Sequence, residues 1–204
     1  MYKRKDAFHA RAKAAGYRSR AAYKLLELAQ RHGLIHLGDH VLDLGAWPGG
    51  WLQVAAELVG PTGVVVGVDL VPIDPLPSAV VACVCGDARD RAVREEILRR
   101  CDGRVDVLLS DMAPKLTGVR ATDTARAAEL AAAAIETAQH VLRPHGRLLM
   151  KVFMSEETNR LVRGLRGQFQ AVKLTRPEAT RRGSAEIYVI ALGFRRPAAD
   201  RTPR

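Results

Sequence analysis

Cysteine is scarce in this sequence, and long hydrophobic runs are missing from it. The 204 residues include three cysteines, and Cys83 and Cys85 fall in "VVACVCGD", whose apolar alternation is typical of a strand. An odd cysteine count in such a setting disfavours a disulfide framework and a zinc site. No apolar run approaches the roughly 18 residues that span a bilayer, and the N-terminus has no signal-peptide apolar region. We therefore expect a soluble cytoplasmic protein with no metal and no membrane partner.

Acidic residues are also few relative to basic ones. Lys and Arg number 32 against 22 Asp and Glu, which gives a net charge of +10 and a pI near 10.1. The excess is concentrated in residues 1–24, where Asp6 is the single acid and Tyr and Phe are interleaved. This distribution predicts contact with a nucleic acid, although a solvated tail or an organelle-targeting peptide is an alternative. The cations of this stretch are Lys3, Arg4, Lys5, Arg11, Lys13, Arg18, Arg20 and Lys24.

Beyond this stretch, apolar runs alternate with helical patterns, which is typical of an α/β fold with a mostly parallel sheet flanked by helices. A chain of 204 residues that is 48% hydrophobic suits one compact domain. We expect that domain over residues 17–196, after a basic N-terminal tail (1–16) and before a flexible C-terminal tail (197–204). Strands are predicted at 40–45, 63–70, 79–87, 104–111, 146–153, 170–174 and 185–194. Helices are predicted at 19–33, 50–59, 88–100, 125–142 and 156–166.

The stretch "HVLDLGAWPGGW", residues 40–51, is a candidate ligand site. A strand that ends near Asp43 and Gly45, followed by a turn and a helix from Gly49, brings backbone N–H groups to the carboxyl edge of the sheet. Glycine at such a turn allows a ligand to touch the main chain. The spacing is not the dinucleotide pattern Gly-x-Gly-x-x-Gly. On its own, the stretch indicates either a nucleotide-like ligand or a tight strand-to-helix turn.

Two further carboxylates favour the ligand interpretation. Asp69 closes the next strand, in "VVVGVDL", where an acid can accept hydrogen bonds from ribose hydroxyls. Asp87 closes the third strand, in "VCGDARD", where a carboxylate can accept a hydrogen bond from an adenine amino group. Each alone is equally well a helix cap or a solvated strand end. Acids at three successive strand ends predict a nucleoside site.

A family resemblance now becomes specific. The segments "DLGAWPGGW", "VDLVPIDP", "GDARD", "SDMAPKLTG", "LLMKVF" and "SAEIYVIALG" resemble, in order, the signatures of the bacterial FtsJ/RrmJ-type ribosomal RNA large subunit methyltransferases. The resemblance runs from about Tyr17 to Phe194. It implies a class I S-adenosylmethionine-dependent methyltransferase fold, Rossmann-like, with a seven-stranded sheet whose last strand is antiparallel. It also implies methylation of a uridine ribose 2'-hydroxyl with S-adenosyl-L-methionine as the cofactor.

The resemblance assigns site residues as well. It places the methionine part of the cofactor at the glycine turn, its ribose at Asp69 and its adenine at Asp87. The residues implied for the turn and its surroundings are Asp43, Gly45, Trp47, Gly49, Trp51 and Asp111. The implied catalytic set is Lys24, Asp111, Lys151 and Glu186. The sequence departs from the family pattern at Trp47, where Ala is usual, at Lys115, where Asn is common, and at Ala185, where Arg is usual.

The chemistry gives an independent reason for the four catalytic residue types. A sulfonium methyl is already electrophilic, so the protein must chiefly align the 2'-oxygen and help to remove its proton. Partial burial and a neighbouring cation favour the neutral form of a lysine, so Lys24 beside Lys151 would allow Lys151 to act as the base. Asp111 and Glu186 would hold the two amines in place. The residue types leave open whether Lys151 accepts the proton or only orients the hydroxyl.

Basic residues are expected to flank this centre and bind RNA phosphates, which supplies affinity but little sequence information. They lie before it, at Arg18 and Arg20, and after it, at Arg176, Arg181 and Arg182. We expect a monomer that methylates ribosomal RNA, within the large ribosomal subunit, and that recognises its substrate largely through shape. The alternatives are a transfer RNA methyltransferase, a weakly active RNA-binding ribosome-assembly factor, and a nicotinamide-dependent oxidoreductase.

Overall fold

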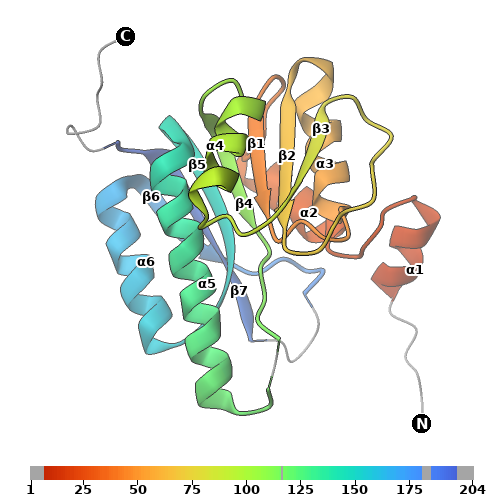
Figure 1. The fold of residues 1–204 in the computed structure, drawn as a ribbon. Coiled ribbons are helices and arrows are strands. Elements are labelled where there is room, and N and C mark those ends of the chain that lie inside the picture. Colours follow the sequence, from red (N-terminus) through yellow and green to blue (C-terminus); the bar gives the residue numbers. More distant parts are fainter. Residues whose placement is uncertain (1–6, 116, 181–184, 197–204) are drawn as a thin grey trace.

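The structure of this chain, a computed structural model, describes residues 7–115, 117–180 and 185–196. A seven-stranded sheet runs through its centre in the order β3-β2-β1-β4-β5-β7-β6 (Figure 1). The strands β1 to β5 pair in parallel, whereas β7 is antiparallel to both β5 and β6. This topology confirms the predicted class I fold. The strands are β1 (His40–Leu44), β2 (Val64–Asp69), β3 (Val81–Cys85), β4 (Val105–Ser110), β5 (Leu142–Phe153), β6 (Phe169–Thr175) and β7 (Glu186–Phe194).

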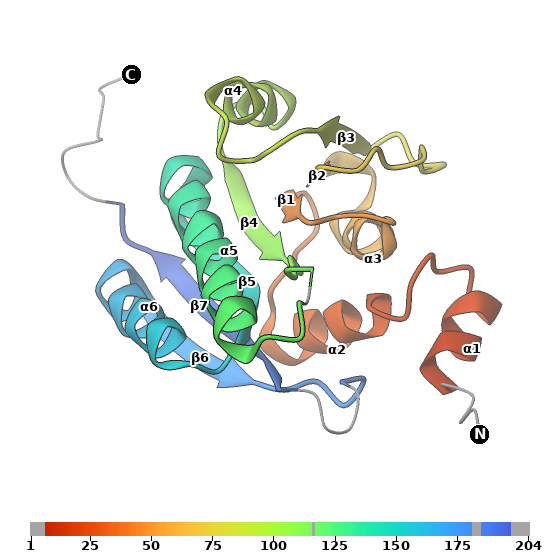
Figure 2. The same ribbon diagram turned by 60° about the horizontal axis from the view of Figure 1, so that its bottom comes forward.

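Helices cover both faces of the sheet. The turned view separates α2 and α3, which lie on one face, from α4, α5 and α6, which lie on the other (Figure 2). The helices are α1 (Ala7–Ala14), α2 (Ala22–His32), α3 (Gly50–Val59), α4 (Arg91–Arg100), α5 (Arg120–Val141) and α6 (Glu156–Gln168), and a short 3-10 helix, η1 (Gly60–Thr62), follows α3. In the described part of the chain, every helix is too short or too polar to cross a membrane.

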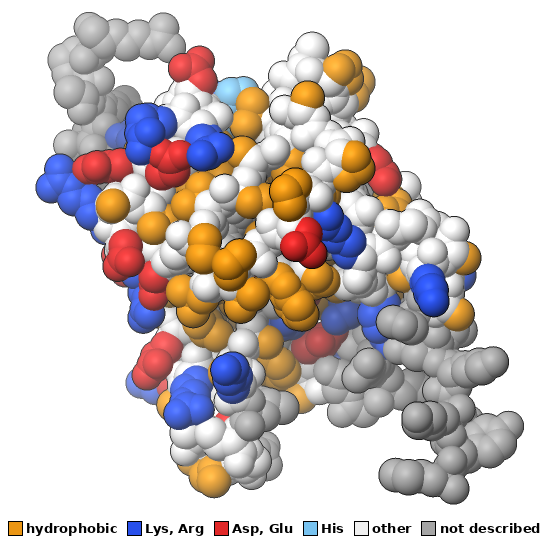
Figure 3. All heavy atoms as spheres, turned by 45° about the vertical axis from the view of Figure 1, so that its right-hand side comes forward, with side chains coloured by type: hydrophobic (Ala, Val, Ile, Leu, Met, Phe, Trp, Pro, Cys, Tyr) orange, Lys and Arg blue, Asp and Glu red, His pale blue; other side chains and the backbone are white. Residues whose placement is uncertain are grey.

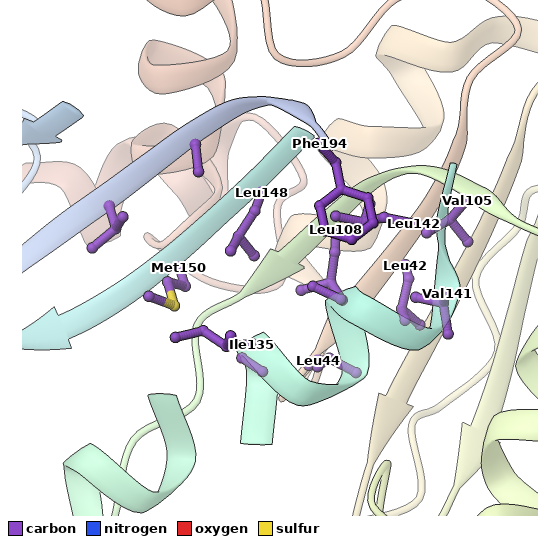
Figure 4. Close-up of a cluster of buried hydrophobic side chains, with 14 of the residues drawn as sticks. Leu42, Leu44, Val105, Leu108, Ile135, Val141, Leu142, Leu148, Met150 and Phe194 are labelled. Carbon is purple, nitrogen blue, oxygen red and sulfur yellow. The ribbon is translucent and has the colours of Figure 1, made fainter. Parts of the chain in front are cut away.

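The two faces of the central strands carry two separate hydrophobic cores. Side chains alternate along a strand, so neighbouring residues point to opposite faces. On β1, Leu42 belongs to the core under α4, α5 and α6, whereas Val41 belongs to the core under α2 and α3. Figure 4 shows part of the first core, in which Leu108 and Leu148 of adjacent strands lie with Ile135 of α5. Burying each such side chain contributes roughly 1.5–3 kcal/mol, which explains why these strands are apolar on both faces.

Differences from the predicted elements are local. Helix α4 begins at Arg91 and not at Ala88, because Asp87 organises the residues between them into a turn: its carboxylate accepts the backbone N–H of Arg89 at 2.9 Å. Helix α5 begins earlier than predicted, at Arg120. Strand β5 also begins earlier, at Leu142.

Helix α1 is a larger difference, because the residues before Tyr17 were expected to be held loosely. The side chain of Ala12 is buried at 2% exposure, and the guanidinium of Arg11 lies 4.7 Å from the ring centroid of Tyr23 on α2. A cation over an aromatic ring is attracted to it. These contacts hold the described part of the predicted tail against the domain.

Candidate active site

The site lies at the edge of the sheet where β1, β2 and β4 end. The strand register pairs Leu44 with both Val68 and Ser110, so the segments that follow these three strands leave the sheet side by side. The backbone N–H of Gly45 donates to the carbonyl of Val68 at 2.9 Å, and that of Asp111 donates to Leu44 at 3.2 Å. The predicted turn and the predicted acids therefore meet at one edge.

A cavity of about 400 Å³ opens at this edge. Its volume is typical of a small-molecule site. Five of the residues predicted for the cofactor line it, namely Gly45, Trp47, Asp69, Asp87 and Asp111. Apolar side chains that the sequence had not singled out, among them Met112 and Leu130, complete its wall. The cavity thus combines carboxylates with an apolar surface, as expected for a nucleoside.

Glycine at position 45 is required by both space and backbone geometry. Gly45 has φ of 74°, a left-handed conformation that favours glycine. A Cβ added there would lie 2.8 Å from Cγ and 3.1 Å from Cα of Met112. Because the backbone of Met112 cannot move away as a flexible side chain would, any larger residue would displace the cavity wall.

Asp69 is held by the backbone on both sides. Its Oδ2 accepts the N–H of Trp47 at 2.9 Å, and its Oδ1 accepts the N–H of Val71 at 2.9 Å. Carboxylate oxygens have about four acceptor sites in total, so Asp69 retains capacity for further donors. Asp69, which is predicted to bind the ribose, is therefore oriented before any ligand binds, and it joins the turn after β1 to the turn after β2.

Asp87 has a side-chain partner that the sequence reading did not identify. The guanidinium of Arg89 lies against the carboxylate, with Nε 3.0 Å from Oδ1 and Nη2 2.5 Å from Oδ2. The hydrogen bonds from Arg89 lower the pKa of Asp87. Asp87 is accordingly an anion, and Arg89 is the residue that fixes its orientation.

Asp43 lies behind the turn and is fully buried. Neither of its carboxylate oxygens has a hydrogen-bond partner among the described residues. Burial, followed by the charges of Asp111 and Asp69, raises the pKa of Asp43 well above its usual value. Buried polar groups without partners are rare in proteins, so this carboxyl is held at a cost in stability.

The residues that line the cavity fit S-adenosyl-L-methionine. Acidic side chains line the cavity at Asp69, Asp87 and Asp111, and Asp43 lies close enough to be affected by the charges of two of them. Such a site favours a ligand that carries positive charge, as the sulfonium and ammonium groups of this cofactor do. The backbone approach at Gly45 and the apolar wall suit its nucleoside part. In the described ranges, no group of three or more His, Cys, Asp or Glu residues is placed to hold a metal ion.

Lys151 and Asp111 form the first of two ion pairs beside the cavity. Nζ of Lys151 lies 2.8 Å from Oδ1 of Asp111 and also donates to the Asp111 carbonyl at 2.6 Å. The side chain of Lys151 is 8% exposed, and that of Asp111 is 20% exposed. Asp111 lines the cavity as well, so it links the predicted cofactor side of the site to the side of the lysines, which is predicted to hold the ribose hydroxyl and is called the hydroxyl side below.

Lys24 and Glu186 form the second ion pair, with Nζ and Oε1 2.5 Å apart. Glu186 lies two residues before Tyr188, which the antiparallel register of β5 and β7 places opposite Lys151. Residues two apart on a strand share a face, so all three face α2, which carries Lys24. The structure thus brings the four predicted catalytic residues together, each lysine beside its own carboxylate.

Tyr188 is a further site residue that the sequence analysis did not identify. Its hydroxyl donates to Oδ1 of Asp111 at 3.0 Å, and its ring centroid lies 5.8 Å from Nζ of Lys24. Burial, followed by the negative charges of Asp111 and Glu186, raises the pKa of Tyr188, which remains a protonated donor. Tyr188 therefore touches both ion pairs.

Two residues predicted for the cofactor support the turn from behind and do not line the cavity. Trp51 is 3% exposed, and its indole N–H donates to the carbonyl of Ala21 at 2.8 Å. A Cβ on Gly49 would lie 3.1 Å from Nη1 of Arg18. Together with Asp43 they stand in the second layer of the site, and a direct cofactor contact for these three stays a prediction.

The basic residues predicted for RNA separate into three groups. Arg18 donates to the carbonyls of Pro48, Asp74 and Pro75 at 3.1, 2.7 and 2.7 Å, so it anchors the loop after β2. Arg20 donates to the carbonyl of Ala179 at 2.5 Å, which joins the start of α2 to the loop after β6. The side chains of Arg11, Lys13 and Arg176 are exposed. Lys3, Arg4, Lys5, Arg181 and Arg182 lie outside the described residues.

Comparison with known proteins finds related sequences along most of the chain. The sequence model of the FtsJ-like methyltransferase family matches residues 17–194. Proteins named ribosomal RNA large subunit methyltransferase E are similar along almost the whole chain. One from Natronomonas pharaonis is 48% identical over 93% of this chain and 74% of its own length. Another, from Acidithiobacillus ferrooxidans, is 46% identical over 97% of this chain and 89% of its own length.

Solved structures show the same fold. A Plasmodium falciparum protein described as a ribosomal RNA methyltransferase superposes with a TM-score of 0.75 and 31% identity, over 87% of this chain and 98% of the other. Aeropyrum pernix fibrillarin, solved with natively bound S-adenosyl-L-methionine, gives a TM-score of 0.58 at 21% identity, over 86% of this chain and 75% of the other.

Proposed function

The chain belongs to the FtsJ-like methyltransferase family, and on that basis we propose that it is an S-adenosyl-L-methionine-dependent RNA ribose 2'-O-methyltransferase. Its substrate is large-subunit ribosomal RNA, as the names of the relatives imply, and the acceptor is a uridine, as the sequence resemblance implies. The observation that carries the proposal is the position of the two lysine–carboxylate pairs beside the cavity. The pair of Lys151 and Asp111 borders the cavity through Asp111, and the pair of Lys24 and Glu186 lies next to it across Tyr188. A nicotinamide-dependent oxidoreductase fits the glycine turn poorly and leaves these two lysines unexplained.

In this proposal, the cavity holds the cofactor through groups already in position. Asp69 accepts hydrogen bonds from the ribose, Asp87 accepts one from the adenine amino group, and the backbone at Gly45 approaches the methionine part. When bound, the cofactor supplies an electrophilic methyl group on a sulfonium. The protein has to place a hydroxyl oxygen in line with that methyl, and such alignment alone removes several kcal/mol from a barrier.

The hydroxyl side supplies alignment and removes a proton. Nζ of Lys151, fixed by Asp111, lies next to the cavity, so it can hold the ribose 2'-hydroxyl and, in its neutral form, accept the hydroxyl proton. Lys24 and Glu186 stabilise the same arrangement from the far side of Tyr188. The exposed cations Arg11, Lys13 and Arg176 contact phosphates around this centre.

The test offers methyl-labelled cofactor to large ribosomal subunits, free ribosomal RNA and transfer RNA, and then maps the labelled nucleotide. We expect label on one uridine ribose of the large-subunit RNA, and we expect the protein to act as a monomer. A parallel reaction with that nucleotide replaced by its 2'-deoxy form should incorporate no label. Label on a base, or on transfer RNA alone, would contradict the proposal. Binding of cofactor and RNA without transfer would instead indicate an assembly factor.

A further inference from the structure

Trp47 differs from the other tryptophan of the chain in its exposure. Trp51 is buried at 3% exposure, whereas Trp47 is 57% exposed although it lines the cavity. One part of its surface therefore faces the cofactor site and another part faces solvent. Position 47 is also where this sequence departs from the Ala that is usual in the resembling family. A large exposed aromatic beside a reaction centre is a candidate contact for a ligand.

Two other exposed apolar side chains stand beside Trp47. Leu70 is 70% exposed and Val71 is 50% exposed. Asp69 fixes their position relative to Trp47, because its carboxylate accepts the backbone N–H groups of both Trp47 and Val71 at 2.9 Å. We call Trp47, Leu70 and Val71 the rim cluster. Figure 3 shows hydrophobic side chains gathered in the middle of the face it displays, with both basic and acidic side chains around them.

A cation adjoins the rim cluster. The guanidinium of Arg18 lies 3.1 Å from the carbonyl oxygen of Pro48, the residue that follows Trp47. Its charge remains although its N–H groups hold backbone carbonyls, since arginine is always protonated. An apolar aromatic surface next to a positive charge matches a nucleotide, which combines a flat base with a phosphate.

We propose that the rim cluster is a stacking platform for an unpaired base of the RNA, next to the nucleotide whose ribose enters the site. This inference rests on the proposed function. Trp47 and Asp111 line the same cavity, so a base on Trp47 lies within one or two nucleotides of the reacting ribose. Bases splayed from single-stranded RNA commonly stack on aromatic side chains. The cofactor is not the proposed occupant, because its polar groups face the carboxylates of the inner wall, whereas Trp47 and Leu70, which also line the cavity, are 57% and 70% exposed to solvent.

The first experiment compares Trp47→Ala with Trp47→Phe. Loss of base stacking should raise the KM or Kd for RNA roughly 5- to 150-fold in Trp47→Ala, a larger factor than the change in the cofactor Kd that follows from the place of Trp47 in the cavity wall. Trp47→Phe keeps a flat ring and should stay within about fivefold of the parent. Leu37→Ala is the matched control: Leu37 is 80% exposed but precedes β1, at the opposite edge of the sheet, so RNA binding should not change. Equal RNA affinity in Trp47→Ala and the parent overturns the platform.

The second experiment needs no methyl transfer and so separates this inference from the proposed function. Acrylamide quenching of tryptophan fluorescence reports mainly on exposed Trp47, and Trp47→Phe supplies the Trp51 background. Short oligouridine and large-subunit RNA should each protect Trp47 from quenching in the absence of cofactor. Protection by S-adenosyl-L-methionine alone, with none from RNA, would make Trp47 a cover of the cofactor and would overturn the platform. Protection by RNA without any methylation would support the platform and contradict the proposed activity.

Discussion

The cofactor side and the hydroxyl side of the site are held together in different ways. On the cofactor side the partners are 2 to 22 residues apart: Asp69 accepts the N–H of Val71 and that of Trp47, and Asp87 accepts the N–H of Arg89. On the hydroxyl side the partners are 40 residues apart for Lys151 and the Asp111 carbonyl, and 162 residues apart for Lys24 and Glu186. The cofactor side is built by the turns that follow neighbouring strands, whereas the hydroxyl side also requires α2 and the antiparallel strand β7.

This difference has energetic consequences. A carboxylate fixed by backbone N–H groups keeps its place when neighbouring side chains change. The hydroxyl side consists of two partly buried ion pairs joined by Tyr188, and removal of one member leaves a partner with unsatisfied charge. Substitutions on the cofactor side should therefore change ligand affinity, whereas those on the hydroxyl side should change the rate of the chemical step.

The largest effect is expected for Lys151→Ala. Loss of a positioned proton acceptor typically lowers a rate about 100- to 10,000-fold, and lost alignment of the hydroxyl adds to that. Cofactor affinity should be preserved, because Lys151 does not line the cavity. Single-turnover methylation at saturating cofactor and RNA measures the step, and calorimetry measures cofactor binding.

Lys151→Arg sharpens the same test. It keeps the positive charge but cannot give up a proton at ordinary pH, so its rate should fall nearly as far. A near-normal rate for Lys151→Ala would remove this lysine from the mechanism and leave Asp111 as the candidate.

Asp69→Ala should be the strongest change on the cofactor side. Removing a charged hydrogen-bond partner costs about 1–3 kcal/mol, which corresponds to roughly 5- to 150-fold in cofactor affinity. RNA affinity should stay close to that of the parent. Asp69→Asn, which keeps one acceptor oxygen, should lose less. Calorimetric titration with S-adenosyl-L-methionine checks both, and an unchanged affinity in folded Asp69→Ala would rule out the ribose assignment.

The same contrast explains what the sequence could predict. Each β-strand was predicted near its place because apolar runs of suitable length alternate with helical periods, and the glycine turn follows from residues adjacent in the chain. Asp69 and Asp87 were found in the same way, as acids at strand ends. Local pattern therefore predicted Gly45, Asp69 and Asp87 of the cavity lining, whereas Trp47 and Asp111 were predicted through the family resemblance.

Tyr188 was missed because its role depends on register. In "SAEIYVIALG" it alternates like any buried strand residue, and only the pairing of β5 with β7 sets it opposite Lys151 and within 3.0 Å of Asp111. The four proposed catalytic residues were predicted through the family resemblance. Helix α1 was missed for another reason: an eight-residue helix at a chain end is marginal by itself and is stabilised here by contact with α2.

Asp43→Asn tests, through stability, whether the buried carboxyl behind the glycine turn lacks a compensating partner. The pKa of Asp43 is raised, so the folded chain binds its proton more tightly than the unfolded chain does. The free energy of unfolding should therefore fall as pH rises from about 4 towards the raised pKa, by about 1.4 kcal/mol per pH unit for one proton. Asp43→Asn lacks this titration. Urea unfolding without cofactor across this range should show a shallower decline in the variant, and parallel curves would contradict an uncompensated Asp43.

The smallest effect is expected for Tyr188→Phe, which asks whether the two ion pairs act as one unit. The change removes one hydrogen bond to Asp111 and keeps the ring that packs against Trp51. A lost hydrogen bond of this kind costs about 0.5–1.5 kcal/mol, so the single-turnover rate should fall roughly 2- to 12-fold, with cofactor affinity unchanged. Because the raised pKa of Tyr188 keeps the phenol protonated, the pH profile should keep its shape.

Tyr17→Phe is the matched control for this last test. It removes a hydroxyl that donates to Glu57 at 2.9 Å, on residues that do not line the cavity, and should leave the rate unchanged. A loss in Tyr188→Phe as large as that in Lys151→Ala would place the phenol in the proton transfer. No loss at all would mean that Lys151 alone orients Asp111, and the pair formed by Lys24 and Glu186 would then act independently of the first.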